Sequence, residues 1–506
     1  MSFSLQSAQT IAGSGLVAIN QGFTVISQNV ANAETEGYAT EQTTQTALDA
    51  GGVGLGVRLG PTGLVQDQAL QTQLYGQNAS AGGAQVTDAL AQLQPVLGSV
   101  GAGNDLGSLL GNVQTGFSAL LNDPSSQAQQ NAVVNAAQQL TAKINTLSSA
   151  FGTARQNAQS TIVSQVATLN TALAAIGQIS NRIEILQARG DSTADLQNQR
   201  NAQAATISGL VDARFVALPN GDLQVFTTSG AQLPTCGPPP LSIAAAQTGP
   251  SLFYPGGGLP GITLGGADVT GQLGGGAIAA AVALRDTTIP TYSAELDEFS
   301  QNLAGRFQAQ GLTLFSDGSG NVPVSTGAPV QSGYVGFSAI ITVNPAVVQT
   351  PSLVRDGTQA VAGSPTGASA FTPNPNNEAG FNTLIQRVLN YALGPNVQDG
   401  VPQTPVATTG LGPGGNLAAP FGAPAAIGDV ANAITVSLSA DSANAKTAAT
   451  DAAATQTALA TNLHAKTGVN MDSQLSLMVQ LQNAYGANAK IISTIQQMYN
   501  TLLQAV

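Results

Sequence analysis

The C-terminal segment carries an apolar residue at every seventh position, and this repeat is the strongest constraint on the fold. A period of seven is typical of α-helices that pack on another helix along a seam. A second line of apolar residues, three positions after the first, is interrupted by Gln474 and Asn488. The expected C-terminal seam consists of Met471, Met478, Tyr485, Ile492, Tyr499 and Val506 in the first line, and of Leu481, Ile495 and Leu502 in the second.

The N-terminal segment predicts a partner for this helix. Its apolar residues from Leu5 to Val30 are separated by steps of 3, 4, 4, 3, 4, 3 and 4, a heptad pattern with one four-residue stutter near Gly13 and Gly15. Two terminal helices with matched seams are expected to pair as a coiled coil. The expected N-terminal seam consists of Leu16, Ile19, Phe23, Ile26 and Val30.

The faces opposite these seams are almost uncharged. Between Thr467 and Val506 the charged residues are Asp472 and Lys490. Two interpretations stay open: a coiled coil inside one monomer, or helices that neighbouring copies also cover. An exposed helix normally carries charged residues on its outer face, so the uncharged faces favour the second interpretation.

The whole chain is poor in charge, with 8% Asp, Glu, Lys and Arg and a net charge of −12. An ordinary soluble protein has about 25% charged residues. The 14 basic residues and the acidic balance argue against nucleic acid and anionic membranes as partners, since both require Lys/Arg patches. A weakly charged surface suits a subunit that associates with copies of itself.

We expect neither a cleaved secretory signal nor a membrane helix. The first basic residue is Arg58, so the positive segment that begins a conventional signal peptide is missing. The longest apolar run, residues 277–284, is far shorter than the roughly 20 residues of a membrane span. These features fit a cytoplasmic protein, and they equally fit export by a route that reads an uncleaved N-terminus.

The pattern along the chain predicts a mainly α fold with a smaller β part, in an elongated multidomain subunit. Helical spacing dominates 66–207, stops at Gly190, resumes from about Ala194 to Val211, and returns at 276–310 and from about Ile427. The segment "ARFVALPNGDLQVFTT" predicts a β-hairpin. We expect four parts. In the core domain, residues 1–50, which comprise the N-terminal helix and the joint that links it to the body, pair with 468–506. A helical bundle consists of 51–210, 275–320 and 425–467, a hairpin-containing insertion of 211–274, and an irregular Gly/Pro-rich outer region of 321–424.

No catalytic, cofactor-binding or metal site is predicted. The one histidine, His464, lies in a polar helical context and is interpreted as solvated. Cys236, the one cysteine, lies in a Pro-rich loop and is interpreted as an incidental thiol. A single cysteine also excludes an intrachain disulfide. Asp297 and Glu298 are adjacent on a helix and do not share a face, so we expect surface charges. The stretch "GGVGLG" at 51–56 is expected to be a tight turn between strands.

The stretch "SQNVANAETEGYAT", residues 27–40, marks the end of the N-terminal helix. Asn32 and Gly37 tolerate the left-handed conformation of a helix end. The wider segment 14–43 resembles the N-terminal segment shared by flagellar axial proteins, that is, rod, hook and hook-associated proteins. The core of that motif corresponds here to Ser27, Asn29, Asn32, Thr35, Gly37 and Tyr38.

Five later segments resemble the family of flagellar hook-associated protein 1, found at the hook–filament junction. They are "GGVGLGVRLGPTGLVQDQAL", "LQNQRNAQAATISGLVDARFVALPNGDLQVFTTSGAQL", "GGAIAAAVALRDTTIPTYSAELDEFSQNLAGRFQAQ", "ITVNPAVVQTPSLVRDG" and "TGVNMDSQLSLMVQLQNAYGANAKIISTIQQMYNTLL". The chain departs from the family pattern at Glu36, where Pro is frequent, and at Thr40-Glu41, where a basic residue is frequent. The short central region suggests a reduced outer domain.

The resemblance implies a structural role and no enzymatic activity. Such proteins are exported unfolded by the flagellar type III apparatus and assemble in a helical ring between hook and filament. The implied partners are further copies, hook protein, the neighbouring junction protein and an export chaperone on the C-terminal helix. The alternatives are another axial component, such as a hook or rod protein, and a cell-envelope enzyme, which should show a cluster of titratable residues.

Overall fold

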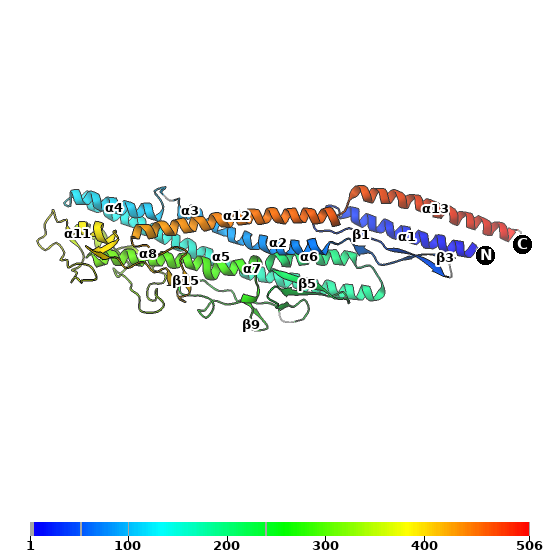
Figure 1. Ribbon diagram of the computed structural model, residues 1–506, viewed down its shortest axis with the longest axis horizontal. Coiled ribbons are helices and arrows are strands. Elements are labelled where there is room, and N and C mark those ends of the chain that lie inside the picture. Colours follow the sequence, from blue (N-terminus) through cyan, green and yellow to red (C-terminus); the bar gives the residue numbers. More distant parts are fainter. Residues whose placement is uncertain (1–4, 51–52, 100, 238–239, 505–506) are drawn as a thin grey trace.

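The molecule is elongated and mainly helical, with both chain ends at one tip (Figure 1). The computed structural model describes residues 5–50, 53–99, 101–237 and 240–504. The helices α1 and α13 form the tip, and the other long helices run parallel to the long axis of the body. This architecture, with paired terminal helices, confirms the predicted fold class.

Helices account for most of the described chain. The α-helices are α1 (Leu5–Ala31), α2 (Gln68–Thr87), α3 (Gln94–Leu97), α4 (Leu106–Asn122), α5 (Gln127–Arg189), α6 (Ala194–Leu210), α7 (Gly276–Ala283), α8 (Ile289–Ala309), α9 (Pro345–Gln349), α10 (Leu353–Asp356), α11 (Thr383–Arg387), α12 (Ile427–Thr467) and α13 (Met471–Gln504). The 3₁₀ helices are η1 (Asp88–Leu93), η2 (Thr270–Gln272) and η4 (Phe337–Ala339), and π-helices are η3 (Leu284–Thr288) and η5 (Val388–Ala392).

The strands form small antiparallel sheets. They are β1 (Glu41–Gln42), β2 (Gln45–Ala50), β3 (Val53–Leu59), β4 (Gly63–Leu64), β5 (Ala213–Ala217), β6 (Leu223–Thr227), β7 (Gln232–Leu233), β8 (Thr263–Leu264), β9 (Ala267–Asp268), β10 (Phe315–Ser316), β11 (Thr342–Val343), β12 (Asn396–Gln398), β13 (Val401–Pro402), β14 (Thr409–Leu411) and β15 (Leu417–Ala418). β5 and β6 are the predicted hairpin, extended by β7. The glycine-rich stretch joins β2 to β3, although its residues 51 and 52 lie outside the described residues.

The helix α5 forms the spine of the body. Ser126 caps its first turn by accepting a hydrogen bond from the Gln129 backbone N–H. The helix ends at the predicted Gly190, which adopts the left-handed conformation with φ of +77°. One 18-residue window of α5 is apolar enough for a membrane span by length and composition, with mean hydropathy 1.3. In this fold, apolar residues of α5 supply two hydrophobic cores, one with α4, α8 and α12 and the other with α6, α7 and β6.

The Gly/Pro-rich segment 321–424 packs into the first of these cores. Phe337, Phe371 and Leu384 are buried in the same cluster as α4 and α8. Asp297 and Glu298 fasten the segment to α8, and their predicted exposure is wrong, because each is only 4% exposed. Asp297 accepts hydrogen bonds from the backbone N–H groups of residues 336 and 338, and Glu298 accepts one from the Tyr334 hydroxyl. The helical pattern does not reveal this burial, because 321–424 and neighbouring helices cover α8 on several sides.

Glu295 is a buried carboxyl group in the contact between α8 and α12. It is 2% exposed, and neither of its carboxylate oxygens has a hydrogen-bond partner among the described residues. Asp441 on α12 faces it and accepts a hydrogen bond from the Tyr292 hydroxyl at 2.8 Å. Burial first, and the Asp441 carboxylate second, raise the pKa of Glu295 to about 8. The folded state therefore holds a proton here that the unfolded chain has released.

Glu295→Gln should remove a pH dependence of stability. Because its pKa is raised on folding, Glu295 destabilises the parent by roughly 1.4 kcal/mol per pH unit as pH rises from about 4.5 to about 8. We expect the variant to melt at a higher temperature than the parent at pH 8, with the difference shrinking towards pH 4.5. Thermal unfolding of both proteins across this range measures it. The exposed Glu36→Gln is the control and should leave the pH profile unchanged; equal profiles for Glu295→Gln and the parent would contradict the interpretation.

Candidate functional site: the paired termini and the joint

The helices α1 and α13 pack antiparallel in one heptad register. Gly15 lies opposite Asn488 and Gly22 lies opposite Leu481. Asn29 lies opposite Gln474, whose Oε1 accepts a hydrogen bond from Asn29 Nδ2 at 3.3 Å. From one contact to the next, α1 advances seven residues while α13 goes back seven. These three contacts define the inner line of α13: Gln474, Leu481, Asn488 and, by the same spacing, Ile495.

Glycines on α1 allow the two helices to approach closely. A Cβ atom on Gly22 would lie 2.7 Å from Leu481 Cδ1, so the leucine methyl group occupies the space that a side chain would need. A Cβ atom on Gly15 would lie 3.3 Å from Asn488 Oδ1. Small residues in a seam let a large partner insert as a knob into a hole.

The stutter near Gly13 and Gly15 coincides with a contact to the β2–β3 hairpin. Between the two glycines, Ser14 donates a hydrogen bond to the Ile11 carbonyl at 2.8 Å and accepts one from the Val57 backbone N–H at 3.1 Å. This brings β3 against α1. The segment without bulky side chains thus carries contacts to both α13 and the hairpin.

The residues of the predicted N-terminal seam are all buried or half-buried. Ile19 and Ile26 are buried at 6% and 1% exposure, and Leu16, Phe23 and Val30 are half-buried. The predicted C-terminal seam divides. Ile495 is buried, and Met478, Leu481 and Ile492 are half-buried, whereas Met471, Tyr485 and Tyr499 are exposed. Leu502 belongs to α13, and Val506 lies outside the described residues.

Two apolar lines therefore flank the inner line of α13. The first outer line, which our sequence reasoning missed, consists of Leu477, Ala484, Ile491 and Met498. Leu477, Ile491 and Met498 are 43%, 48% and 50% exposed. The second outer line consists of Met471, Met478, Tyr485, Ile492 and Tyr499. A count of every seventh residue would have found the first outer line, because its members recur at that spacing too.

Asn29 is the centre of the joint between the terminal helices and the body. It is 1% exposed, and its Oδ1 accepts hydrogen bonds from the Tyr38 hydroxyl at 3.1 Å and the Glu41 backbone N–H at 2.9 Å. Its Nδ2 donates to the Glu41 carbonyl at 2.9 Å as well as to Gln474. One amide group therefore connects the end of α1, the chain after the turn and the first turns of α13.

The chain after Tyr38 is bonded to two further parts of the body. Asn198 on α6 accepts a hydrogen bond from the Ala39 backbone N–H and donates one to the Ala39 carbonyl, both at 3.0 Å. Thr40 donates through its N–H to the Thr467 carbonyl and through its hydroxyl to the Gly468 carbonyl, both at 2.7 Å. The connection from α1 and the break between α12 and α13 are thus bonded to each other.

The remaining motif residues stay near the surface. Gly37 has a φ of +75°, in the left-handed region that favours glycine. Ser27 and Asn32 donate hydrogen bonds to carbonyls one turn earlier on α1, and Thr35 donates to Asn32. They shape the turn after α1 and do not reach the body.

Glu41 is buried, while Glu36 is exposed, so the two departures from the family pattern differ in kind. Glu41 is 4% exposed, and its Oε1 has no hydrogen-bond partner among the described residues. Burial, and secondarily the nearby Asp195 carboxylate, raise the pKa of Glu41. A carboxyl group without a cation is held inside the joint.

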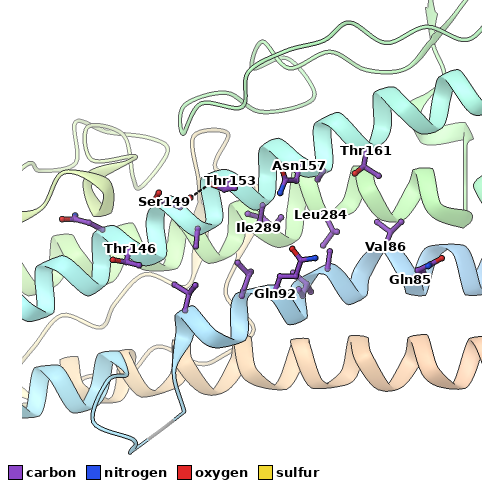
Figure 2. Close-up of a pocket in the computed structure, with 18 residues that line it drawn as sticks. Gln85, Val86, Gln92, Thr146, Ser149, Thr153, Asn157, Thr161, Leu284 and Ile289 are labelled. Atoms are coloured by element: carbon purple, nitrogen blue, oxygen red, sulfur yellow. Dashed lines mark hydrogen bonds between the residues drawn. The ribbon is translucent and has the colours of Figure 1, made fainter.

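The one histidine and the one cysteine both lie on the surface. His464 is exposed on α12, and Cys236 is an exposed free thiol. No group of three or more His, Cys, Asp or Glu residues could hold a metal ion in the part of the chain that the structure describes. One groove, of about 800 Å³, lies between η1–α3 and α5 (Figure 2). Its lining residues, such as Leu93, Thr153 and Ile289, are all uncharged.

Comparisons with known proteins place the chain among flagellar proteins. Residues 90–321 match the model of the flagellar hook-associated protein FlgK helical domain. Residues 465–505 match the model of the flagellar basal body rod FlgEFG protein C-terminal domain. No curated protein matches the sequence. The solved structure of the flagellar hook junction protein FlgK from Burkholderia pseudomallei is similar over 50% of this chain, with 22% identity and a TM-score of 0.39. The chain spans 45% of the length of that structure.

Asn29→Ala should loosen the joint. The substitution leaves the Glu41 N–H, the Tyr38 hydroxyl and the Gln474 amide without their partner, which costs roughly 2–4 kcal/mol over several lost hydrogen bonds. We expect faster hydrogen exchange of the Glu41 and Thr40 amides and of the first turns of α13. Asn32→Ala is the matched control from the same motif, and it should leave these amides protected because the Asn32 side chain bonds to Gln28 in the last turn of α1 and to Thr35 in the turn that follows. Equal protection in both variants would contradict the central position of Asn29.

Proposed function

Because the chain belongs to the FlgK family of flagellar hook-associated proteins, we propose that it is a structural subunit that self-assembles at the hook–filament junction and connects hook to filament. The observation that carries the proposal is the pair of exposed apolar outer lines on α13. Each line runs along the terminal tip, beside the inner line that packs on α1, and each keeps large apolar side chains exposed. Exposed apolar stripes of this kind mark interaction surfaces.

The partners follow from this surface. Each of the two outer lines faces a different side of the α1–α13 pair, and an interface between two unlike surfaces produces rings or helical polymers. Further copies of the chain are thus the first partners, with hook protein and the neighbouring junction protein at the two ends of the assembly. The same apolar lines would associate prematurely inside the cell. An export chaperone that covers α13 therefore belongs to the proposal.

A hook or rod component is the alternative function. It is favoured by the C-terminal match, since that model describes rod-type proteins. The match of 90–321 to the FlgK helical domain favours the junction subunit, because it covers α4, α5 and α8, the body of the molecule. The proposed location is the extracellular flagellum, reached without a cleaved signal peptide.

The proposed division of labour follows four parts of the chain. Residues 1–50 and 468–506 form the assembly domain, and 51–210, 275–320 and 425–467 form the bundle that holds it. The insertion 211–274 and the region 321–424 are attached to that bundle. Asp297 and Glu298 support the attachment of the second, since both accept hydrogen bonds from it.

Ile491→Asp should abolish assembly and leave the monomer folded. Ile491 is 48% exposed in the first outer line, so a carboxylate there remains solvated in the monomer and is desolvated in a polymer contact. Pelleting of assembled protein and thermal unfolding of the monomer measure the two effects. Gln497→Asp, an exposed site outside the inner and outer lines, is the charge-matched control and should still assemble. Normal pelleting of Ile491→Asp would contradict the proposed surface.

Deletion of the chain from Met471 onward tests the same surface more coarsely. We expect soluble monomer that cannot join filaments, because the deletion removes α13 and every apolar line on it. Incorporation of the truncated protein into filaments at the parental level, detected by immunolabelling, would show that the terminal helices are not the assembly surface.

A further inference from the structure

We propose that the Asn29–Gln474 pair and the Gly22–Leu481 contact select the register in which α1 and α13 pack. The inference deepens the proposed function and rests on it, because it assumes that α13 contacts the next subunit. The register decides which residues of α13 face outward, and hence which surface the next subunit meets. Asn29, Gln474, Gly22 and Leu481 are thus specificity-determining residues for the assembly surface.

Apolar periodicity alone does not select this register. Three lines of α13 recur every seven residues, so a slip by one heptad would again place apolar residues along the seam. What distinguishes the observed register is the order along the inner line, which reads Gln474, Leu481, Asn488, Ile495. Opposite it, α1 presents Asn29, Gly22, Gly15 and, by the same spacing, Ala8.

A slip by one heptad towards the body breaks two matches at once. It would place Leu481 opposite Asn29, so one N–H of the Asn29 side chain would lose its acceptor in a buried site. The same slip would place Asn488 in the hole at Gly22 that Leu481 now fills. A slip in the opposite direction would place the Gln474 amide in that hole and remove it from Asn29.

Burial makes the polar match decisive. Asn29 is 1% exposed and Gln474 is 8% exposed, so neither amide can exchange its partner for water without opening the seam. The other three hydrogen bonds of Asn29 go to Tyr38 and Glu41 in the joint, which holds the amide in place. A buried polar residue in a helical seam is a known means of specifying register at some cost in stability.

The experiment reads the register directly by cysteine cross-linking in the full chain, with Cys236→Ser to remove the native thiol. Gly15→Cys with Asn488→Cys reports the observed register, because a Cβ atom on Gly15 lies 3.3–3.5 Å from the Asn488 side chain. Gly15→Cys with Ile495→Cys reports a slip towards the body, and Ala8→Cys with Asn488→Cys reports a slip away from it. Soluble and pelleted fractions are oxidised separately, and intrachain products are separated from dimers by mass.

In the parent background we expect the intrachain 15–488 product and almost none of the slipped products. Gln474→Leu removes the polar partner and keeps the seam apolar. It should raise the share of slipped products by roughly fivefold, the factor for one lost hydrogen bond. Thr40→Val is the matched control, since it removes the bond to the Gly468 carbonyl without touching the seam, and should leave the 15–488 product dominant.

Three results would overturn the proposal. They are an unchanged cross-linking pattern in Gln474→Leu, a slip in Thr40→Val as large as in Gln474→Leu, and the absence of the 15–488 product from both fractions of the parent. Pelleting is measured on the same samples. A chain that forms the 15–488 product but never pellets would contradict the proposed function and leave the register assignment standing.

Discussion

The close antiparallel contact between α1 and α13 determines which surfaces the terminal tip presents. Gly22 and Gly15 bring the helices near enough for Leu481 and Asn488 to fill the space beside them. This contact covers the inner line of α13 and only part of the two outer lines. Large side chains of both outer lines stay exposed, among them Leu477 and Ile491 in the first and Tyr485 and Tyr499 in the second. A tip that is paired within the chain and incomplete on both flanks is what a polymer subunit requires.

The joint transmits the position of this tip to the body. Asn29 ties the end of α1 to Glu41 and to α13, Asn198 holds Ala39 from α6, and Thr40 holds the break between α12 and α13. Two chain crossings between tip and body are therefore fastened to each other and to a helix of the bundle. This arrangement gives the 27–40 motif a physical role: it is a connection of defined geometry, with a buried amide at its centre.

Heptad spacing predicted the terminal helices and their pairing, and turn chemistry predicted Gly190 and the hairpin of β5 and β6. Heptad spacing could not predict the partner of each seam residue, because the period is the same in every heptad register. Gln474 and Asn488 therefore looked like interruptions, whereas they face Asn29 and Gly15. Asp297 and Glu298 looked exposed because a helical pattern cannot reveal a cover supplied by 321–424. Asn198 carries no local signal at all, since its contact with Ala39 joins residues 159 positions apart.

The most direct test of the account is a map of the assembled polymer at side-chain resolution. We predict that Leu477, Ile491, Tyr485 and Tyr499, all exposed in the single chain, are buried against the terminal helices of neighbouring copies, while Gly22 still faces Leu481 within each chain. A map in which these four side chains remain in solvent, with contacts between copies made elsewhere on the body, would contradict it.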